Sequence, residues 1–231
     1  MRIYLGRLVG GLLVLLGAGL VSVAAQSMGV DPESYLTWSS SQAQKIGKST
    51  RENGKAGGSF DLRIISTNKA INYGLRATLM TPEVIRAAAR VVQLRDRLTN
   101  VETRQLVARA EEAGDLVVMI EINPNEGSGV VPLDWRAILQ PKDLVPGASG
   151  AVTGLKAPYL RKNQVLSGVV GRNYEYDVFW VVFPLVDENK KPLFAADVAE
   201  IQLLVGIYSS EGRISWKMPD SLRERMRTLS K

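Results

Sequence analysis

The chain has 231 residues, with 29 Lys and Arg against 23 Asp and Glu, and it contains no cysteine and no histidine. The net charge of +6 is mild, and basic residues alternate with acidic ones, so the composition does not favour a nucleic-acid partner. Without histidine or cysteine, Ser-His-Asp catalysis, Cys-His catalysis and the familiar zinc sites are excluded. Carboxylate, Ser-Lys, tyrosine and oxygen-ligand chemistry are left, and we expect no cofactor.

Residues 1–25 have the three parts of a secretory signal peptide. Two arginines stand at the start, an apolar run covers residues 8–20, and small residues follow up to Ala25. Cleavage after Ala24 or after Ala25 fits the small-residue rule, and we prefer the second. An uncleaved anchor is the alternative, but glycines within the apolar run favour cleavage. The sequence therefore predicts an exported protein, periplasmic or extracellular, with no stable membrane span after cleavage.

The part that follows is polar before it becomes β-rich. Residues 26–59 are rich in Ser, Gln, Lys and Gly, which is typical of an arm and linker, with one short helix near Ser40–Ile46. Residues 60–218 carry the strand patterns of a folded domain. Residues 219–231 predict a basic terminal helix, opened by the capping-box spacing of Ser221 and Glu224.

A helical hairpin at about 82–113 interrupts the strand patterns. Apolar residues alternate with period two over 73–80, and the period then changes to that of a helix at Thr81. Thr81 is a good N-cap, and a proline follows it at the first helical position. Thr99 and Glu102 have the capping-box spacing that opens a second helix.

The remaining patterns indicate short strands joined by short connections. Residues 116–122 and 174–186 are nearly continuous apolar runs, as expected of central strands. Further strands are expected at 60–65, 135–139, 164–170, 200–208 and 213–218. Seven to nine mostly antiparallel strands predict a mainly β (α+β) fold, an immunoglobulin-like or related antiparallel β-sandwich with an inserted helical hairpin.

Three tryptophans are candidate binding residues. Trp135 and Trp216 flank expected turns, and Trp38 lies in the polar arm, so their rings are candidates for stacking on a sugar or packing against a partner. Trp180 lies in the most apolar run, and we expect it in the core.

One loop offers hard oxygen ligands for calcium. Asn123, Asn125, Glu126 and Asp134 lie within twelve positions of one another, which is the ligand chemistry that calcium prefers. The spacing of a calcium-binding loop is missing, and a structural turn explains the same residues.

Two hypotheses for function follow. The first is an exported noncatalytic binding or structural protein of the cell envelope, with a protein or an envelope polysaccharide as its partner. The alternative is a carbohydrate-binding module or a glycoside hydrolase that uses two carboxylates. Two carboxylates that face each other across an aromatic-lined cleft would favour the alternative. The oligomeric state stays open.

Overall fold

The computed structural model describes residues 33–57, 72–125, 128–144, 150–171, 173–187, 190–192 and 194–230. The chain divides into the units Met1–Pro32 and Glu33–Lys231, and the described residues all belong to the second. The expected signal peptide, the expected strand at 60–65 and the candidate ligand Glu126 lie outside the described residues.

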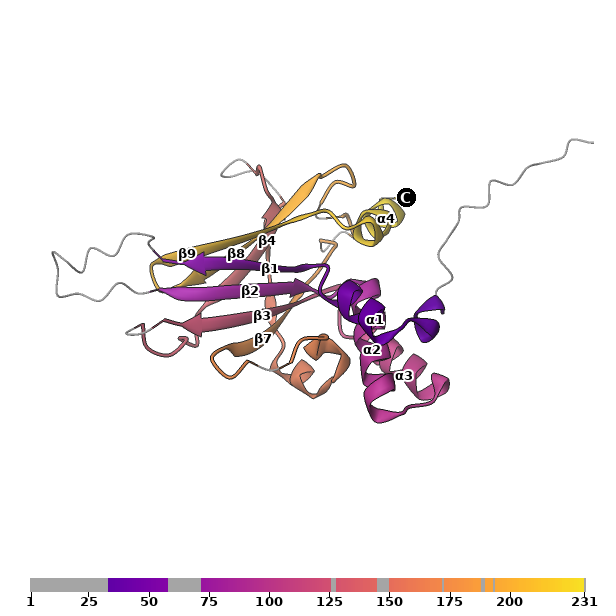
Figure 1. Cartoon of the computed structure of the whole chain (residues 1–231). Helices are drawn as coiled ribbons and strands as arrows, with labels where there is room; N and C mark the ends of the chain where they lie inside the picture. The colour runs from indigo at the N-terminus through magenta and orange to yellow at the C-terminus, as the bar shows by residue number, and fades with distance from the viewer. Residues whose placement is uncertain are drawn as a thin grey trace, which may run out of the picture. The chain divides into compact units, whose positions relative to one another are not determined.

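The described elements follow one another in chain order (Figure 1). They are η1 (Ser34–Thr37), α1 (Ser40–Gly47), β1 (Arg51–Ala56), β2 (Tyr73–Leu79), α2 (Pro82–Asp96), α3 (Asn100–Glu111), β3 (Leu116–Pro124), β4 (Arg136–Pro141), β5 (Val152–Thr153), β6 (Leu155–Lys156), η3 (Pro158–Lys162), η4 (Val165–Ser167), β7 (Asp177–Phe183), β8 (Glu200–Ile207), β9 (Ser210–Lys217) and α4 (Asp220–Leu229). Among these residues, no helix has the length and apolar character needed to cross a membrane.

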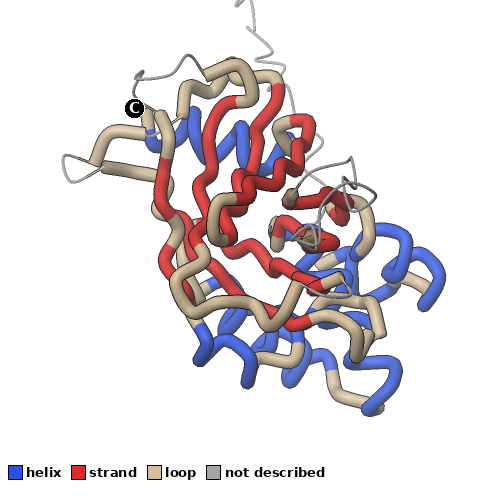
Figure 2. The backbone as a smooth tube through the Cα atoms, turned by 90° about the vertical axis from the view of Figure 1, so that its left-hand side faces the viewer, coloured by secondary structure: helices blue, strands red, loops and turns tan. Residues whose placement is uncertain are grey.

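The strands of the described residues form one nine-stranded antiparallel sheet in the order β5-β4-β8-β9-β1-β2-β3-β7-β6. Its two edge strands, β5 and β6, are consecutive in the chain and are separated only by Gly154. The first pairs with β4 and the second with β7, so this one segment joins the two edges of the sheet. The sheet therefore curls into a nearly closed barrel, and its strands curve around a common interior (Figure 2).

Glycine is required at the joint between the two edge strands. The backbone N–H of Gly154 donates to the carbonyl oxygen of Ala137 on β4, at 2.9 Å. A Cβ at Gly154 would lie 2.2 Å from Cγ1 of Val181 and 2.7 Å from the ring of Phe183, both on β7. Closure thus brings backbone directly onto core side chains, which leaves no room for any other residue.

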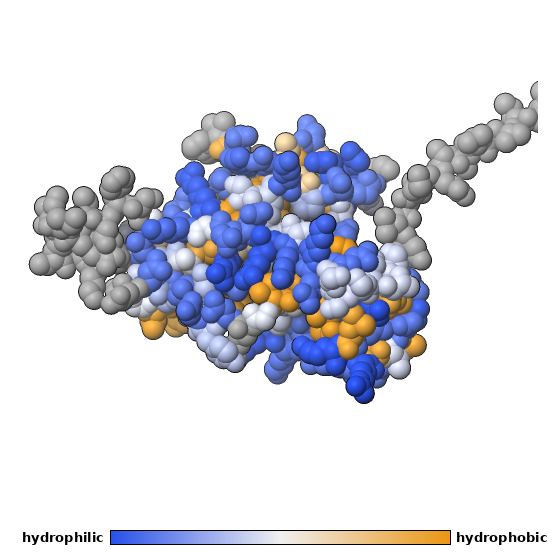
Figure 3. Space-filling model, in the orientation of Figure 1, coloured by the Kyte–Doolittle hydropathy of each residue, from blue (hydrophilic) through white to orange (hydrophobic). Residues whose placement is uncertain are grey.

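Two apolar cores lie on opposite faces of the sheet. The interior core gathers inward side chains from the strands, among them Val118 and Leu203, together with Leu222 and Met226 of α4. The outer core lies between β3 and β7 on one side and α2, α3 and η4 on the other. Apolar residues also gather on the surface over α1 and α2 in the view of Figure 3. Since Met226 is fully buried, the terminal helix is part of the barrel core.

These observations confirm a mixed α+β fold dominated by antiparallel sheet. The immunoglobulin-like sandwich is not confirmed, because the strands belong to one curled sheet instead of two stacked ones. The helical hairpin is present. Its capping box is complete, with the Glu102 N–H donating to Thr99 Oγ1 at 3.3 Å and the Thr99 N–H donating to the Glu102 carboxylate at 2.8 Å.

Three features differ from the sequence-based expectation. The terminal helix begins after Pro219, and Ser221 Oγ donates to the carboxylate of Glu83 instead of forming a capping box with Glu224. Arg51–Ala56, within the expected linker, forms β1 and pairs with β2 at all six positions. Its Gly54 allows this, because a Cβ there would lie 2.6 Å from Cγ1 of Ile214 on β9. The expected edge strand at 164–170 contains the short helix η4, which packs on the outer core.

Candidate binding pocket beside β7

One side of β7 is only partly covered by a neighbouring strand. β3 pairs with β7 along its whole length, from Asp177 to Phe183. On the other side, β6 pairs only at Val181 and Val182. β6 ends there because Pro158, whose ring fixes its φ, begins η3 and leads the chain away from the sheet. Within the described part of the chain, residues 177–179 thus have no strand partner on this side.

The hydrogen bonds show which backbone groups face this free edge. The Ala157 N–H donates to the carbonyl oxygen of Trp180 at 2.8 Å, so the backbone groups of Trp180 point away from β3. Because backbone groups alternate with period two along a strand, the N–H and C=O of Val178 face the same side. The Tyr176 N–H is already used, since it donates to the carbonyl oxygen of Asn173 at 3.2 Å. Val178 therefore presents both a donor and an acceptor at the free edge.

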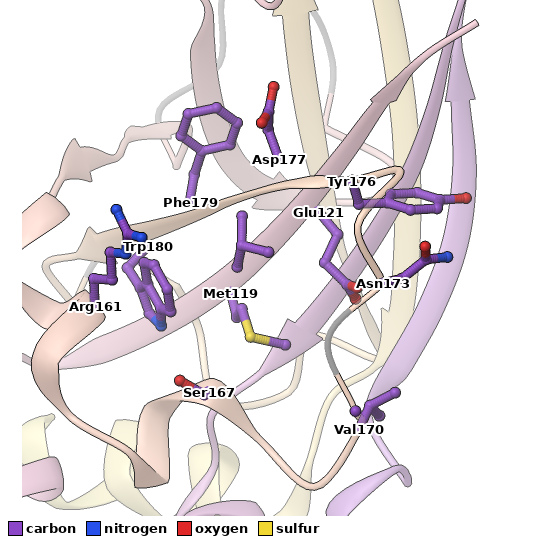
Figure 4. A pocket seen from close by; sticks show the side chains of 12 residues that line it. Met119, Glu121, Arg161, Ser167, Val170, Asn173, Tyr176, Asp177, Phe179 and Trp180 are labelled. Atoms are coloured by element: carbon purple, nitrogen blue, oxygen red, sulfur yellow. The ribbon is translucent and has the colours of Figure 1, made fainter.

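A pocket of about 420 Å³ lies at this edge (Figure 4). This volume is within the range of about 300–1,000 Å³ that is typical of ligand sites. β3 and β7 supply one wall, and the described residues Ser167, Val170, Gly171, Asn173 and Tyr176 supply the other. Its charged lining residues are Glu121, Asp177 and Arg161, and Met119, Val178 and Trp180 are among its apolar ones.

The apolar part of the pocket is held rigidly by Trp180. Its side chain is 6 % exposed, and its indole N–H donates to the carbonyl oxygen of Leu166 at 2.8 Å. This bond ties η4 to β7. The glycine that ends η4, Gly168, has a φ of 69° and lies beside Met119. The ring thus forms part of the wall and presents little of its face to a ligand.

The carboxylate of Glu121 is committed to an ion pair. Nη2 of Arg51 lies 2.7 Å from Oε2 and 3.0 Å from Oε1 of Glu121. The two side chains are only 18 % and 7 % exposed. Nearby, the guanidinium of Arg76 lies 4.1 Å from the ring centroid of Tyr176 and covers one face of that ring.

A second carboxylate, that of Asp177, lines the same pocket but points away from Glu121. Asp177 is paired with Ile122 and Glu121 with Val178, so the two acids lie on opposite faces of the sheet. Figure 4 shows their side chains projecting to opposite sides of β7. They are not arranged as two carboxylates facing across a scissile bond.

The three candidate tryptophans lie apart from this pocket and from one another. Trp135 is 3 % exposed, with its ring centroid 4.9 Å from that of Phe179. Trp216 is 5 % exposed, and its indole N–H donates to the carbonyl oxygen of Thr50. Trp38 is half-buried and packs edge-on against Tyr35. The rings of Trp135 and Trp216 are therefore too buried to stack on a ligand.

Beside Trp135, Nζ of Lys156 lies 4.8 Å from the ring centroid and donates to the carbonyl oxygen of Leu133. Burial lowers the pKa of Lys156, and the nearby charge of Asp134 acts in the opposite direction. The aromatic pair and this lysine close the seam of the barrel next to Gly154. This arrangement gives Trp135 a structural role in closing the barrel.

The expected calcium ligands are not gathered into a site in the described residues. Asn123 is the eighth residue of β3, and Asn125 and Asp134 are exposed on the loop that follows. The structure shows no group of three or more acidic side chains that fits a metal ion among the residues that it describes.

Comparison with known proteins adds little to this geometry. No family model matches the chain. No curated protein matches it either. A solved structure from Burkholderia pseudomallei K96243, described as a novel protein of unknown function, is 13 % identical and covers 68 % of this chain and 80 % of its own. Its TM-score is 0.37, so the likeness carries no argument about fold or function.

Proposed function

We propose that this chain is an exported, noncatalytic binding protein of the cell envelope, and that the pocket beside β7 is its binding site. The observation that carries the proposal is the free backbone donor and acceptor of Val178 at the mouth of a 420 Å³ pocket. Buried or half-buried backbone groups of this kind are normally paired in folded proteins. The signal-like residues 1–25 support export.

A binding role is favoured over catalysis because the pocket lacks an activated group. Its most buried carboxylate, Glu121, is engaged by Arg51. The other carboxylate, Asp177, lies on the opposite sheet face. The chain has neither histidine nor cysteine to serve as a general base or nucleophile near neutral pH.

A polysaccharide ligand is less well supported than a protein. Sugar recognition of the kind considered from the sequence needs an open aromatic face. The ring of Trp180 is buried in the pocket wall, and one face of Tyr176 is covered by Arg76.

Site-specific photocrosslinking tests the proposal in the cell. The full-length gene is expressed in its own host with a photoreactive phenylalanine analogue at Ser167, which is exposed and lines the pocket, or at Thr228, which is exposed on α4. We expect an adduct in the envelope fraction from position 167 and none from position 228. We also expect the exported chain to begin at Ala25, Gln26 or Ser27. Equal labelling from both positions, no labelling, or an intact Met1 in the recovered protein would contradict the proposal.

A further inference from the structure

The free edge of β7 points to a more specific partner. We propose that the pocket receives an extended segment of a partner protein, which adds to the sheet as a strand beside Val178. This inference rests on the proposed binding function and names the class of its ligand.

The backbone argument comes from the point where β6 stops. β6 begins an antiparallel ladder on β7 at Val182 and Val181, and the Ala157 N–H extends it by one bond. The ladder position that comes next, at Val178, has a donor and an acceptor but no strand among the described residues. An added strand provides a matching acceptor and donor from one residue, which is how extended peptides bind exposed sheet edges. Such a strand would continue the ladder that Pro158 interrupts.

The side chains around Val178 indicate which kind of ligand residue would pair with it. A residue paired with Val178 would direct its side chain to the same sheet face as Val178, which is the pocket face of Met119 and Trp180. These two side chains are 4 % and 6 % exposed and form an apolar wall. Glu121 shares this face, but its charge is already balanced by Arg51. The residue paired with Val178 is therefore apolar.

The charges on the other sheet face indicate which residues stand next to this apolar residue in the ligand. Adjacent residues of an added strand would lie on the face of Asp177 and Phe179. Asp177 is exposed and has no ion pair among the described residues. A lysine or arginine next to the apolar residue would lie close to this carboxylate. The ligand is thus an extended segment in which the apolar residue has a basic neighbour on the side that faces Asp177.

Binding of a short synthetic peptide tests this inference. The probe is the fluorescein-labelled peptide Thr-Lys-Val-Lys-Val-Lys-Thr, measured by anisotropy against the purified exported protein. We expect saturable binding that is weakened by at least about tenfold, or about 1.4 kcal/mol, when alternate backbone nitrogens of the peptide are methylated. Replacing its lysines with glutamate should have an effect of similar size. No saturable binding of the lysine peptide, or equal binding of the methylated peptide, would overturn strand addition.

Substitutions in the protein provide matched controls. Val178→Pro removes the N–H at the free edge without removing a hydrogen bond to β3, because that N–H points away from β3. Val178→Thr keeps the N–H and a β-branched side chain. We expect the proline variant to lose at least about tenfold in peptide affinity and the threonine variant to stay within about threefold of the wild type. If the proline variant does not fold, Asp177→Asn replaces it, and it should weaken binding of the lysine peptide several-fold.

The outcome can be separated from that of the proposed function. A small molecule or a polysaccharide crosslinked from position 167, together with no peptide binding, would keep the pocket as a binding site and overturn the strand. The absence of any adduct at position 167 would contradict both proposals. A protein adduct whose crosslinked segment is extended and contains both basic and apolar residues would support the binding site and the strand addition.

Discussion

Replacing Trp180 with alanine is expected to lower the free energy of unfolding by about 3–5 kcal/mol. The indole is 6 % exposed and lies in the outer core between β7 and η4. Its loss would leave a cavity, and it would also remove the hydrogen bond to the carbonyl oxygen of Leu166. That bond holds η4 in place, so the pocket wall should loosen together with the core.

Urea unfolding measures this effect. Tyr174→Ala is the control, because this aromatic side chain in the turn before β7 is 86 % exposed and should contribute little to packing. The free energy of unfolding of Trp180→Phe should lie between those of Trp180→Ala and Tyr174→Ala, since phenylalanine keeps a ring but not the indole N–H. A Trp180→Ala variant as stable as the wild type would mean that the ring is not part of the core, and would favour an aromatic binding face at this position.

Gly154→Ala is expected to cost about 2–3 kcal/mol, although it adds a single methyl group. That methyl would lie 2.2 Å from Val181 and 2.7 Å from Phe183, where β6 leaves β5 to pair with β7. Either the two core side chains must move or the joint between the sheet edges must open. The second change would also expose Trp135, whose fluorescence should then shift towards that of a ring in water.

Gly171→Ala is the matched control for this glycine. A Cβ at Gly171 would have nothing within 4 Å, and its backbone is not in the left-handed region. Thermal unfolding of both variants should therefore show a large drop in Tm for position 154 and almost none for position 171. Equal Tm values for the two variants would contradict the closure of the sheet at Gly154.

The parts of the fold that depend on local signals could be predicted from the sequence. The start of α3 follows from the capping box at Thr99, because a cap acts within one turn of the chain. α2 begins directly after Thr81 as expected, although the Thr81 side chain makes no capping hydrogen bond. β3 follows from its apolar run. The hairpin of β8 and β9 is also present, but its turn lies at Tyr208 and Ser209, and Gly212 lies inside β9. In each case the residues that specify the element lie inside it.

The parts that depend on distant contacts could not be predicted. β1 has a polar sequence, and its place in the sheet is set by pairing with β2 and by the close approach of Ile214 to Gly54. The closure at Gly154 likewise depends on side chains of β7 that lie far along the chain. A sandwich and a curled sheet share the same strand patterns, so periodicity does not distinguish them.

The candidate site was missed for a similar reason. Trp135 and Trp216 flank expected turns, which favours exposed rings, but residues next to a turn can still point into a barrel, and both are buried. The pocket is formed where β6 ends, which is a property of pairing and not of composition. One signal was present: Glu121 is a lone charge within an apolar strand, and such a residue needs a partner on a neighbouring element.

Hydrogen exchange at the amide of Val178 tests the central claim most directly. Phe179 is the internal reference, because its N–H faces β3 within the sheet, whereas the N–H of Val178 faces the pocket. In the free protein we expect the Val178 amide to exchange much faster than the Phe179 amide, and to slow markedly when the lysine peptide is added. A Val178 amide that is as protected as Phe179 in the free protein would show that this edge is already paired, and would contradict the account.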